Sequence, residues 1–209
     1  IYNGLIENYE MLARDILYAE PSKQDIFPDN HDMSRNFSKL NEDYDLFKQA
    51  MVFTLTTRGI PQIYYGTEIL MKNPGTTDHG IIRSDFPGGW PGDKVNAFTG
   101  VGLSEREQEA KAFTKKLVQW RKTASAVHNG QLKHFVPEEG VYVYFRYNDR
   151  QKIMVVLNKN KQASKLALDR FAEVLEGVSS GKEILTGKTI TLDQSLSLTP
   201  NTAMILELK

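Results

Sequence analysis

The chain has 209 residues, carries 26 basic and 26 acidic side chains, and contains no cysteine. This length suffices for one or two domains with a sizeable core, and the lack of cysteine excludes disulfides and thiolate metal sites. A net charge of zero gives no reason to expect nucleic acid or an anionic membrane as a partner, and no apolar run is long enough to span a bilayer. The sequence opens on Ile1 with no signal-peptide pattern, which fits a mature, processed or truncated chain.

The first half of the sequence alternates helical and strand patterns. Apolar residues at helical spacing predict one helix over residues 5–19 and a second over residues 46–55. A short strand is expected at residues 25–27. Residues 60–65 form a continuous apolar run, which is typical of a buried parallel strand. These elements predict an α/β arrangement.

A long loop and a third helix complete the first half. Residues 69–102 are rich in Gly, Pro and Asp, and loops of this length often carry function. A helix is expected from Ser104, because Ser104 and Glu107 form a capping-box pattern. The apolar positions of residues 110–120 then fall on one helical stripe.

The second half reads as short strands and turns. Residues 141–147 and 152–158, joined by Asn148 and Asp149, predict a β-hairpin. Further strand candidates lie at residues 132–136, 188–193, 196–200 and 202–208. Their spacing favours an antiparallel β-sandwich. The sequence is therefore expected to be α/β over residues 1–124 and all-β over residues 125–209.

The stretch FPDNHDMSR, residues 27–35, contains the strongest candidate for chemistry. Asn30, His31 and Asp32 come directly after a predicted strand, and ligand sites in parallel α/β folds lie at the carboxyl ends of strands. An imidazole beside a carboxylate can orient a hydroxyl, stabilise positive charge or exchange protons. Alternatively, Asp32 caps a turn and His31 satisfies backbone groups. For an isolated Asn-His-Asp sequence, this structural interpretation is favoured.

Three segments change that balance. FPDNHD, residues 27–32, resembles the strand-seven motif of the α-amylase family of glycoside hydrolases, and RGIPQIYYGTEI, residues 58–69, resembles its strand-eight segment. DHGIIRSDFPGGW, residues 78–90, and residues 117–135 are similar to the neopullulanase and cyclomaltodextrinase branch. The segments occur in family order and cover nearly the whole chain. With this resemblance, a functional site at residues 30–32 becomes the favoured interpretation.

The resemblance implies the C-terminal part of a (β/α)₈ TIM barrel, with strands seven and eight, followed by an antiparallel β-sandwich domain. It also implies a parent hydrolase that cleaves α-1,4-glucosidic bonds with retention, as in starch degradation. Such hydrolysis needs a carboxylate nucleophile and a carboxylic acid. In the family these lie on strands four and five, and no segment here matches those motifs. We therefore expect the isolated chain to be inactive.

The family's residue roles can be transferred only to matching positions. Asp32 would be the third carboxylate, which binds ring hydroxyls and stabilises the transition state, and His31 would hydrogen-bond a glucose hydroxyl. Asn30 is a further candidate for substrate binding. Interactions that strengthen in the transition state raise the rate rather than only tightening binding. Glu68 matches the glutamate that closes the strand-eight motif, and we interpret it as structural.

The long loop supplies three more substrate-binding candidates. In related enzymes an Asp and an Arg of this loop bind the non-reducing sugars, a role that Asp78 and Arg83 would take here. The alternative is a solvent-facing ion pair within the loop. Trp90 can stack on a sugar ring or anchor the loop, and anchoring is slightly favoured. His79 lies near the expected cleft rim, but a lone loop histidine is more often solvated.

No metal site or cofactor is expected. The acidic residues near the motif lack a calcium-loop spacing. His128 and His134 are interpreted as structural. Tyr142 and Tyr144 share one face of a predicted strand, where cross-strand packing is more common than a sugar platform.

Partners and alternatives follow from the same resemblance. The expected partners are α-glucan oligosaccharides or polysaccharides. A non-catalytic sugar-binding or interaction module and a parent glucanotransferase are the alternatives to a parent hydrolase. The apolar stripes of residues 46–55 and 110–120 would be partly exposed in such a fragment, so we expect self-association through barrel surfaces or burial against the sandwich. The sequence does not distinguish a periplasmic, cell-surface or cytoplasmic location.

Overall fold

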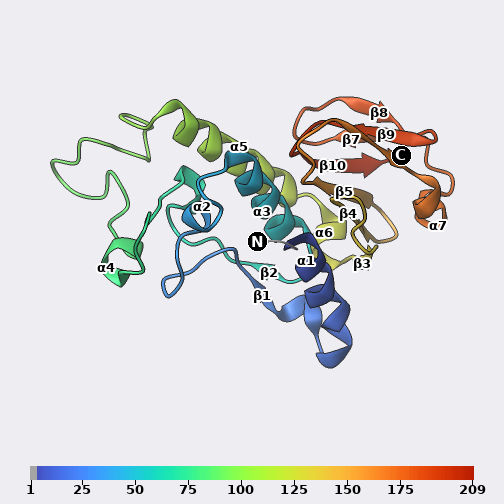
Figure 1. Cartoon of the computed structure of the whole chain (residues 1–209), viewed down its shortest axis with the longest axis horizontal. Helices are drawn as coiled ribbons and strands as arrows, with labels where there is room; N and C mark the ends of the chain where they lie inside the picture. The colour runs from blue at the N-terminus through green and yellow to red at the C-terminus, as the bar shows by residue number, and fades with distance from the viewer. Residues whose placement is uncertain (1–3) are drawn as a thin grey trace.

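The computed structural model describes residues 4–209. Its first part consists of helices and a small parallel sheet, and its second part is a β-sandwich that packs against several of those helices (Figure 1). In the sheet, β1 (Asp25–Ile26) pairs in parallel with β2 (Ile60–Pro61), with Asp25 opposite Ile60. The parallel pairing agrees with the predicted α/β arrangement.

The helices mostly follow the apolar periodicity. The helix predicted over residues 5–19 is α1 (Gly4–Ala13) followed by the 3₁₀ turn η1 (Arg14–Leu17). The helix predicted over residues 46–55 is α3 (Tyr44–Thr56), whose N-cap Asp43 accepts hydrogen bonds from two backbone amides. The remaining helical segments of this part are η2 (Pro21–Lys23), α2 (Asn36–Lys39), η3 (Thr67–Ile69), α4 (His79–Ile82), α5 (Glu105–Arg121) and α6 (Ser125–Asn129).

The N-terminus of α5 confirms the predicted capping box. The backbone N–H of Glu107 donates to Ser104 Oγ over 3.3 Å, and the Glu107 carboxylate accepts from the Ser104 N–H over 2.7 Å. Both groups would otherwise lack partners at a helix start. The capping box therefore fixes where the long loop ends and α5 begins.

The prediction of a buried strand over residues 60–65 is wrong. β2 contains only Ile60 and Pro61, and Ile60 is 53% exposed. Within residues 4–209, β2 pairs with β1 alone, so its apolar side chains are not enclosed between further strands and helices. Gly66, at φ 83°, then turns the chain into η3.

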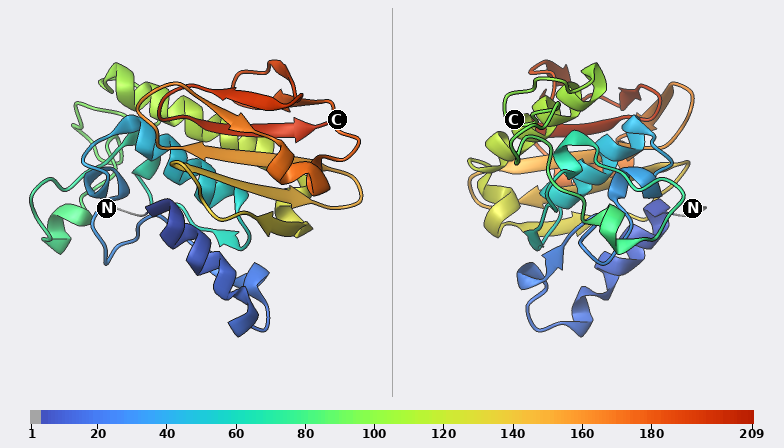
Figure 2. Two further views of the ribbon diagram at one scale, coloured as in Figure 1. Left: turned by 45° about the vertical axis from the view of Figure 1, so that its right-hand side comes forward. Right: turned by 90° about the vertical axis from the view of Figure 1, so that its left-hand side faces the viewer.

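The second part is a six-stranded sheet covered by a two-stranded sheet (Figure 2). The large sheet has the order β3-β4-β5-β10-β7-β8, and all its pairs are antiparallel. The predicted hairpin is β4 (Val141–Tyr147) with β5 (Lys152–Asn158). The other elements are β3 (Gln131–His134), β6 (Ser164–Ala167), η4 (Asp169–Phe171), α7 (Ala172–Leu175), β7 (Ser180–Glu183), β8 (Thr189–Thr191), β9 (Ser195–Leu198) and β10 (Ala203–Leu208).

The two parts share one hydrophobic core. Phe53 of α3 packs edge-on against Tyr144 of β4, with ring centroids 6.0 Å apart, and Thr56 hydrogen-bonds the Tyr144 hydroxyl. A second polar contact across the interface joins α5 to β10, where the indole N–H of Trp120 donates to Glu207 over 2.8 Å. Tyr142 and Tyr144 are fully buried in this core, which confirms their packing role.

Of the two expected outcomes for the apolar stripes, burial against the sandwich is the one observed. Phe47, Met51 and Leu55 of α3 and Leu117 of α5 are at most 2% exposed. The exposed large apolar side chains of the first part lie elsewhere, mainly on η1, around the two short strands and in the long loop, and include Ile16, Leu17, Phe27, Ile60 and Phe98. Self-association through this surface stays a prediction.

His134, at the interface between α1 and the sandwich, is expected to make the stability of the fold depend on pH. Its Nδ1 lies 2.9 Å from the Tyr142 hydroxyl, and its ring packs 4.7 Å from that of Tyr9. Burial lowers the pKa of His134 below its usual 6.5; Asp15 opposes this effect and Arg58 adds to it. The unfolded chain therefore binds the proton more readily than the folded chain. Stability should fall as the pH decreases from about 6.5 towards the lowered pKa.

Denaturant unfolding at about pH 7.5 and about pH 5 measures this effect. The loss of stability on acidification is expected to shrink in His134→Gln, which cannot take up the proton. His128→Gln is the matched control, because His128 is exposed and bonds only locally to the Arg121 carbonyl. An unchanged pH dependence in His134→Gln would contradict the assignment.

Candidate functional site

Asn30, His31 and Asp32 lie on a tight loop directly after β1. The Asn30 side-chain oxygen accepts from the Asp32 N–H over 2.9 Å, so Asn30 shapes the turn. His31 and Asp32 project to solvent, and the Asp32 side chain is 60% exposed. The loop thus presents an imidazole and a carboxylate at the carboxyl end of a parallel strand, where the sequence placed them.

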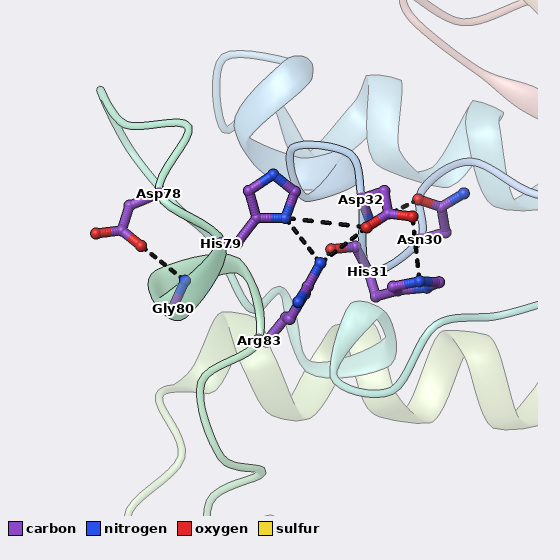
Figure 3. Close-up of polar contacts among 7 residues, drawn as sticks. All are labelled: Asn30, His31, Asp32, Asp78, His79, Gly80 and Arg83. Carbon is purple, nitrogen blue, oxygen red and sulfur yellow. Dashed lines mark hydrogen bonds and ion pairs between the residues drawn. The ribbon is translucent and has the colours of Figure 1, made fainter.

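Both oxygens of Asp32 have partners (Figure 3). Arg83 Nη2 lies 2.8 Å from Oδ1, and His31 Nε2 lies 3.1 Å from Oδ2. Arg83 also donates from Nε to the His31 carbonyl over 3.0 Å, which makes its guanidinium bridge the side chain and the backbone of this loop. Arg83 therefore pairs with Asp32, and the alternative of an ion pair with Asp78 inside the long loop is wrong.

Asp78 is not brought into this cluster. It is the N-cap of α4, where its Oδ1 accepts from the Gly80 N–H over 2.7 Å. Its side chain points away from Asp32 and Arg83 (Figure 3). Capping fixes the start of a four-residue helix that carries Arg83 at its C-cap. Asp78 thus stabilises the start of the helix that carries Arg83. Its sugar-binding role stays a prediction.

His79, which was expected near the cleft rim but was interpreted as a solvated loop histidine, joins the site. Its Nδ1 lies 2.9 Å from Arg83 Nη2 and 3.9 Å from Asp32 Oδ1. The signal that would have found it is its spacing, because residues four apart share one face of a helix and His79 stands four residues before Arg83. We name His31, Asp32, His79 and Arg83 the Asp32 cluster.

Trp90 does not anchor the long loop, contrary to the slightly favoured interpretation. Its side chain is 63% exposed. The loop is held instead by Asp93, which accepts from the N–H groups of Gly88 and Trp90, and by a small core that includes Ile69 and Leu103. An exposed indole is free to stack on a sugar ring, a role that stays a prediction. Glu68 lies in η3 and is half-buried.

A buried carboxylate lies beneath the exposed loop. Asp29 is fully buried and accepts from the Asn36 N–H over 2.7 Å and from the Thr67 hydroxyl over 3.0 Å. Burial raises the pKa of Asp29, while these hydrogen bonds and the nearby Arg35 lower it. Asp29 therefore connects the loop to α2 and η3.

Within residues 4–209, no group of three or more acidic or histidine side chains is suited to hold a metal ion. No helix of this range is long and apolar enough to cross a membrane.

Comparison with known families decides the identity of this arrangement. Residues 3–129, more than half of the chain, match the catalytic domain of α-amylase. The chain belongs to the α-amylase family. Residues 132–207 match the cyclomaltodextrinase C-terminal domain. This α-amylase-family chain thus joins part of a catalytic domain to a C-terminal β domain. The boundary at residues 124 and 125 stays a prediction.

Similar curated proteins are longer. A cyclomaltodextrin glucanotransferase from Niallia circulans is 30% identical over 175 residues, which are 80% of this chain and 22% of that protein. An α-amylase from the same organism is 28% identical over 180 residues, which are 82% of this chain and 30% of that protein. The chain therefore spans less than a third of the length of these relatives.

Solved structures confirm the fold. The structure of an AmyP variant in complex with maltotriose superposes with a TM-score of 0.80 at 21% identity, covering 96% of this chain and 44% of that one. The α-amylase from Geobacillus thermoleovorans, complexed with acarbose, gives a TM-score of 0.74 at 22% identity, covering 96% and 42%. The fold is accordingly part of an α-amylase catalytic domain followed by the C-terminal domain.

Proposed function

We propose that this chain is the C-terminal portion of a retaining α-glucan hydrolase of the neopullulanase or cyclomaltodextrinase type, and that the Asp32 cluster binds the glucan. The observation that carries this proposal is the meeting of Asp32 with Arg83, two residues 51 positions apart, at the exposed carboxyl end of β1. Both side chains reach solvent. They offer a sugar a carboxylate acceptor and a planar fork of donors, which suits vicinal hydroxyls.

The chemistry assigns a separate role to each group. The Asp32 carboxylate accepts hydrogen bonds from ring hydroxyls and places negative charge beside an oxocarbenium-like transition state. His31 is held by Asp32 over 3.1 Å and can donate to or accept from a glucose hydroxyl. Arg83 orients Asp32 through a charge-assisted bond and retains further N–H donors for the sugar. Asn30 and Trp90 complete the proposed surface, through the turn and through stacking respectively.

The proposal includes the inactivity of the chain on its own. Retaining hydrolysis requires two carboxyl groups about 5–5.5 Å apart, one as nucleophile and one as acid. Asp32 is the one exposed carboxylate of its cluster, and Asp29 is buried beneath it, bonded to Asn36 and Thr67. Neither the nucleophile nor the acid is assigned to this chain. Both would come from polypeptide that is not part of it.

A parent glucanotransferase is the second candidate. It is supported by the similarity to the cyclomaltodextrin glucanotransferase of Niallia circulans. A glycosyl-enzyme intermediate can be intercepted by a sugar hydroxyl as well as by water, and the Asp32 cluster would bind the glucan in either reaction. A non-catalytic sugar-binding module would also keep the cluster, but without turnover in the parent.

A turnover assay tests this proposal. We expect the chain to release no sugar from maltooligosaccharides or pullulan, because a lone exposed carboxylate supplies neither the covalent step nor the acid. The measurement is the release of reducing sugar by the wild type and by Asp32→Asn at matched concentrations. If the wild type releases sugar and Asp32→Asn does not, the proposed inactivity is contradicted, since the chain would then assemble a working set of carboxylates.

A further inference from the structure

Arg35 is a buried cation placed three residues after Asp32. Its side chain is fully buried and forms no direct ion pair among the described residues, although the buried carboxylate of Asp29 is near enough to interact with its charge. Its Nε donates to the Ile82 carbonyl over 2.9 Å, and its Nη1 donates to the Tyr65 carbonyl. The guanidinium carbon also lies 4.2 Å from the ring centroid of Tyr64 and 4.8 Å from that of Tyr65. One side chain thus holds two separate backbone segments.

These two segments flank the Asp32 cluster. Ile82 is the last residue of α4 and immediately precedes Arg83. Tyr65 precedes the turn into η3, and its own hydroxyl donates to the Ser84 carbonyl over 2.9 Å. The backbone of Arg35 is fixed as well, because its N–H donates to Asn73 over 2.8 Å. Arg35 therefore connects the loop that carries Asp32 to the helix that carries Arg83.

The energetics argue against a role in stability alone. Moving a guanidinium out of water is costly, and apolar side chains of similar volume often stabilise a core as well or better. Moreover, its Nη2 is buried without a hydrogen-bond partner among the described residues. What an apolar side chain cannot supply is two directed hydrogen bonds that fix the Ile82 and Tyr65 carbonyls relative to each other.

We infer that Arg35 is a positioning residue for glucan binding, which sets the distance between Asp32 and Arg83 by holding the backbone at Ile82 and Tyr65. This inference rests on the proposed function, in which Asp32 and Arg83 contact the sugar. Arg35 itself does not reach the surface, so its effect is transmitted through Arg83. Loss of Arg35 releases the C-terminal end of α4, and Arg83 then no longer stays within 2.8 Å of Asp32.

Hydrogen exchange tests the positioning without any sugar. The N–H groups of Ile82 and Arg83 donate to the Asp78 and His79 carbonyls within α4. Arg35→Met should speed their exchange about tenfold or more, since local opening of the last turn becomes easier. Arg35→Lys keeps the charge but loses the planar guanidinium donors, so it should give a smaller increase in exchange rate. This variant replaces Arg35→Met in the measurement if Arg35→Met does not fold.

Arg146→Met is the matched control for this measurement. Arg146 is 2% exposed and also donates to backbone carbonyls, those of Thr56 and Gly130, but it lies in β4 of the sandwich. The Arg146→Met substitution should change the exchange rates of the α4 amides only as far as it changes the free energy of global unfolding. If the amides of Ile82 and Arg83 exchange no faster in Arg35→Met than in Arg146→Met, the inference is overturned.

Binding of maltotriose separates positioning from a general structural role. Arg35→Met should weaken binding by about the same factor as Arg83→Ala, and the double variant should bind no more weakly than Arg83→Ala alone. Losses that multiply in the double variant would overturn the inference. If the wild type does not bind maltotriose at all, the proposed function fails, and the exchange result still decides whether Arg35 positions Arg83.

Discussion

Replacement of Phe53 by alanine is expected to lower the free energy of unfolding by about 3–5 kcal/mol, the usual cost of emptying a buried aromatic site. Phe53 is 8% exposed and packs edge-on against Tyr144, so it lies where α3 meets the sandwich. The cavity would open in a core to which Val155 and Ile205 of the sandwich also belong. Because that core is shared, the loss should affect both parts of the chain together.

Denaturant titration followed by tryptophan fluorescence and by far-ultraviolet circular dichroism measures this effect. The two signals should report one coincident transition, shifted to lower denaturant in Phe53→Ala. Phe98→Ala is the matched control: Phe98 is 68% exposed, and its loss should change stability by less than about 0.5 kcal/mol. A wild type that unfolds in two separate transitions would contradict a shared core.

Replacement of Asp32 by asparagine is expected to weaken maltotriose binding about 10- to 100-fold. A hydrogen bond to a charged group contributes about 1.5–3 kcal/mol, and each 1.4 kcal/mol corresponds to a factor of ten. Asparagine keeps the size of the side chain but loses the charge that holds Arg83 at 2.8 Å and His31 at 3.1 Å. The variant should therefore lose both the acceptor for the sugar and the arrangement of its neighbours.

The folded state should tolerate this substitution. The Asp32 side chain is 60% exposed, and exposed ion pairs contribute about 0–1 kcal/mol to stability. Asp149→Asn is the control, because Asp149 is exposed in the turn between β4 and β5. Isothermal calorimetry should show the loss of affinity in Asp32→Asn only. Equal affinities in the two variants would exclude Asp32 from the site.

Much of the fold could be predicted because its signals are local. The capping box at Ser104 and Glu107 uses residues three positions apart, and the hairpin of β4 and β5 follows from alternating patterns around one turn. Strands β6 and β7 could not be found in the same way. Their sequences, Ser164–Ala167 and Ser180–Glu183, are short and lack a clear alternating apolar pattern. Pairing with other strands keeps them extended: β6 pairs with β9, and β7 pairs with β8 and β10.

The candidate site could be predicted in part. The motif placed Asn30, His31 and Asp32 at a strand end, because that depends on neighbouring residues alone. The pairing of Asp32 with Arg83 depends on how the long loop brings α4 next to the loop after β1, which no local pattern specifies. Arg35 was missed for the same reason, since its partners at Tyr65 and Ile82 are 30 and 47 positions away.

Titration of the ¹⁵N-labelled chain with maltotriose tests most directly whether the Asp32 cluster is the glucan-binding site. Saturable shifts are expected for the backbone amides of residues 30–32 and 79–83, and they should be lost in Asp32→Asn. The amides of β4 and β5 should not respond, since these strands lie in the sandwich. Shifts confined to the sandwich, or shifts unchanged in Asp32→Asn, would contradict glucan binding at this cluster.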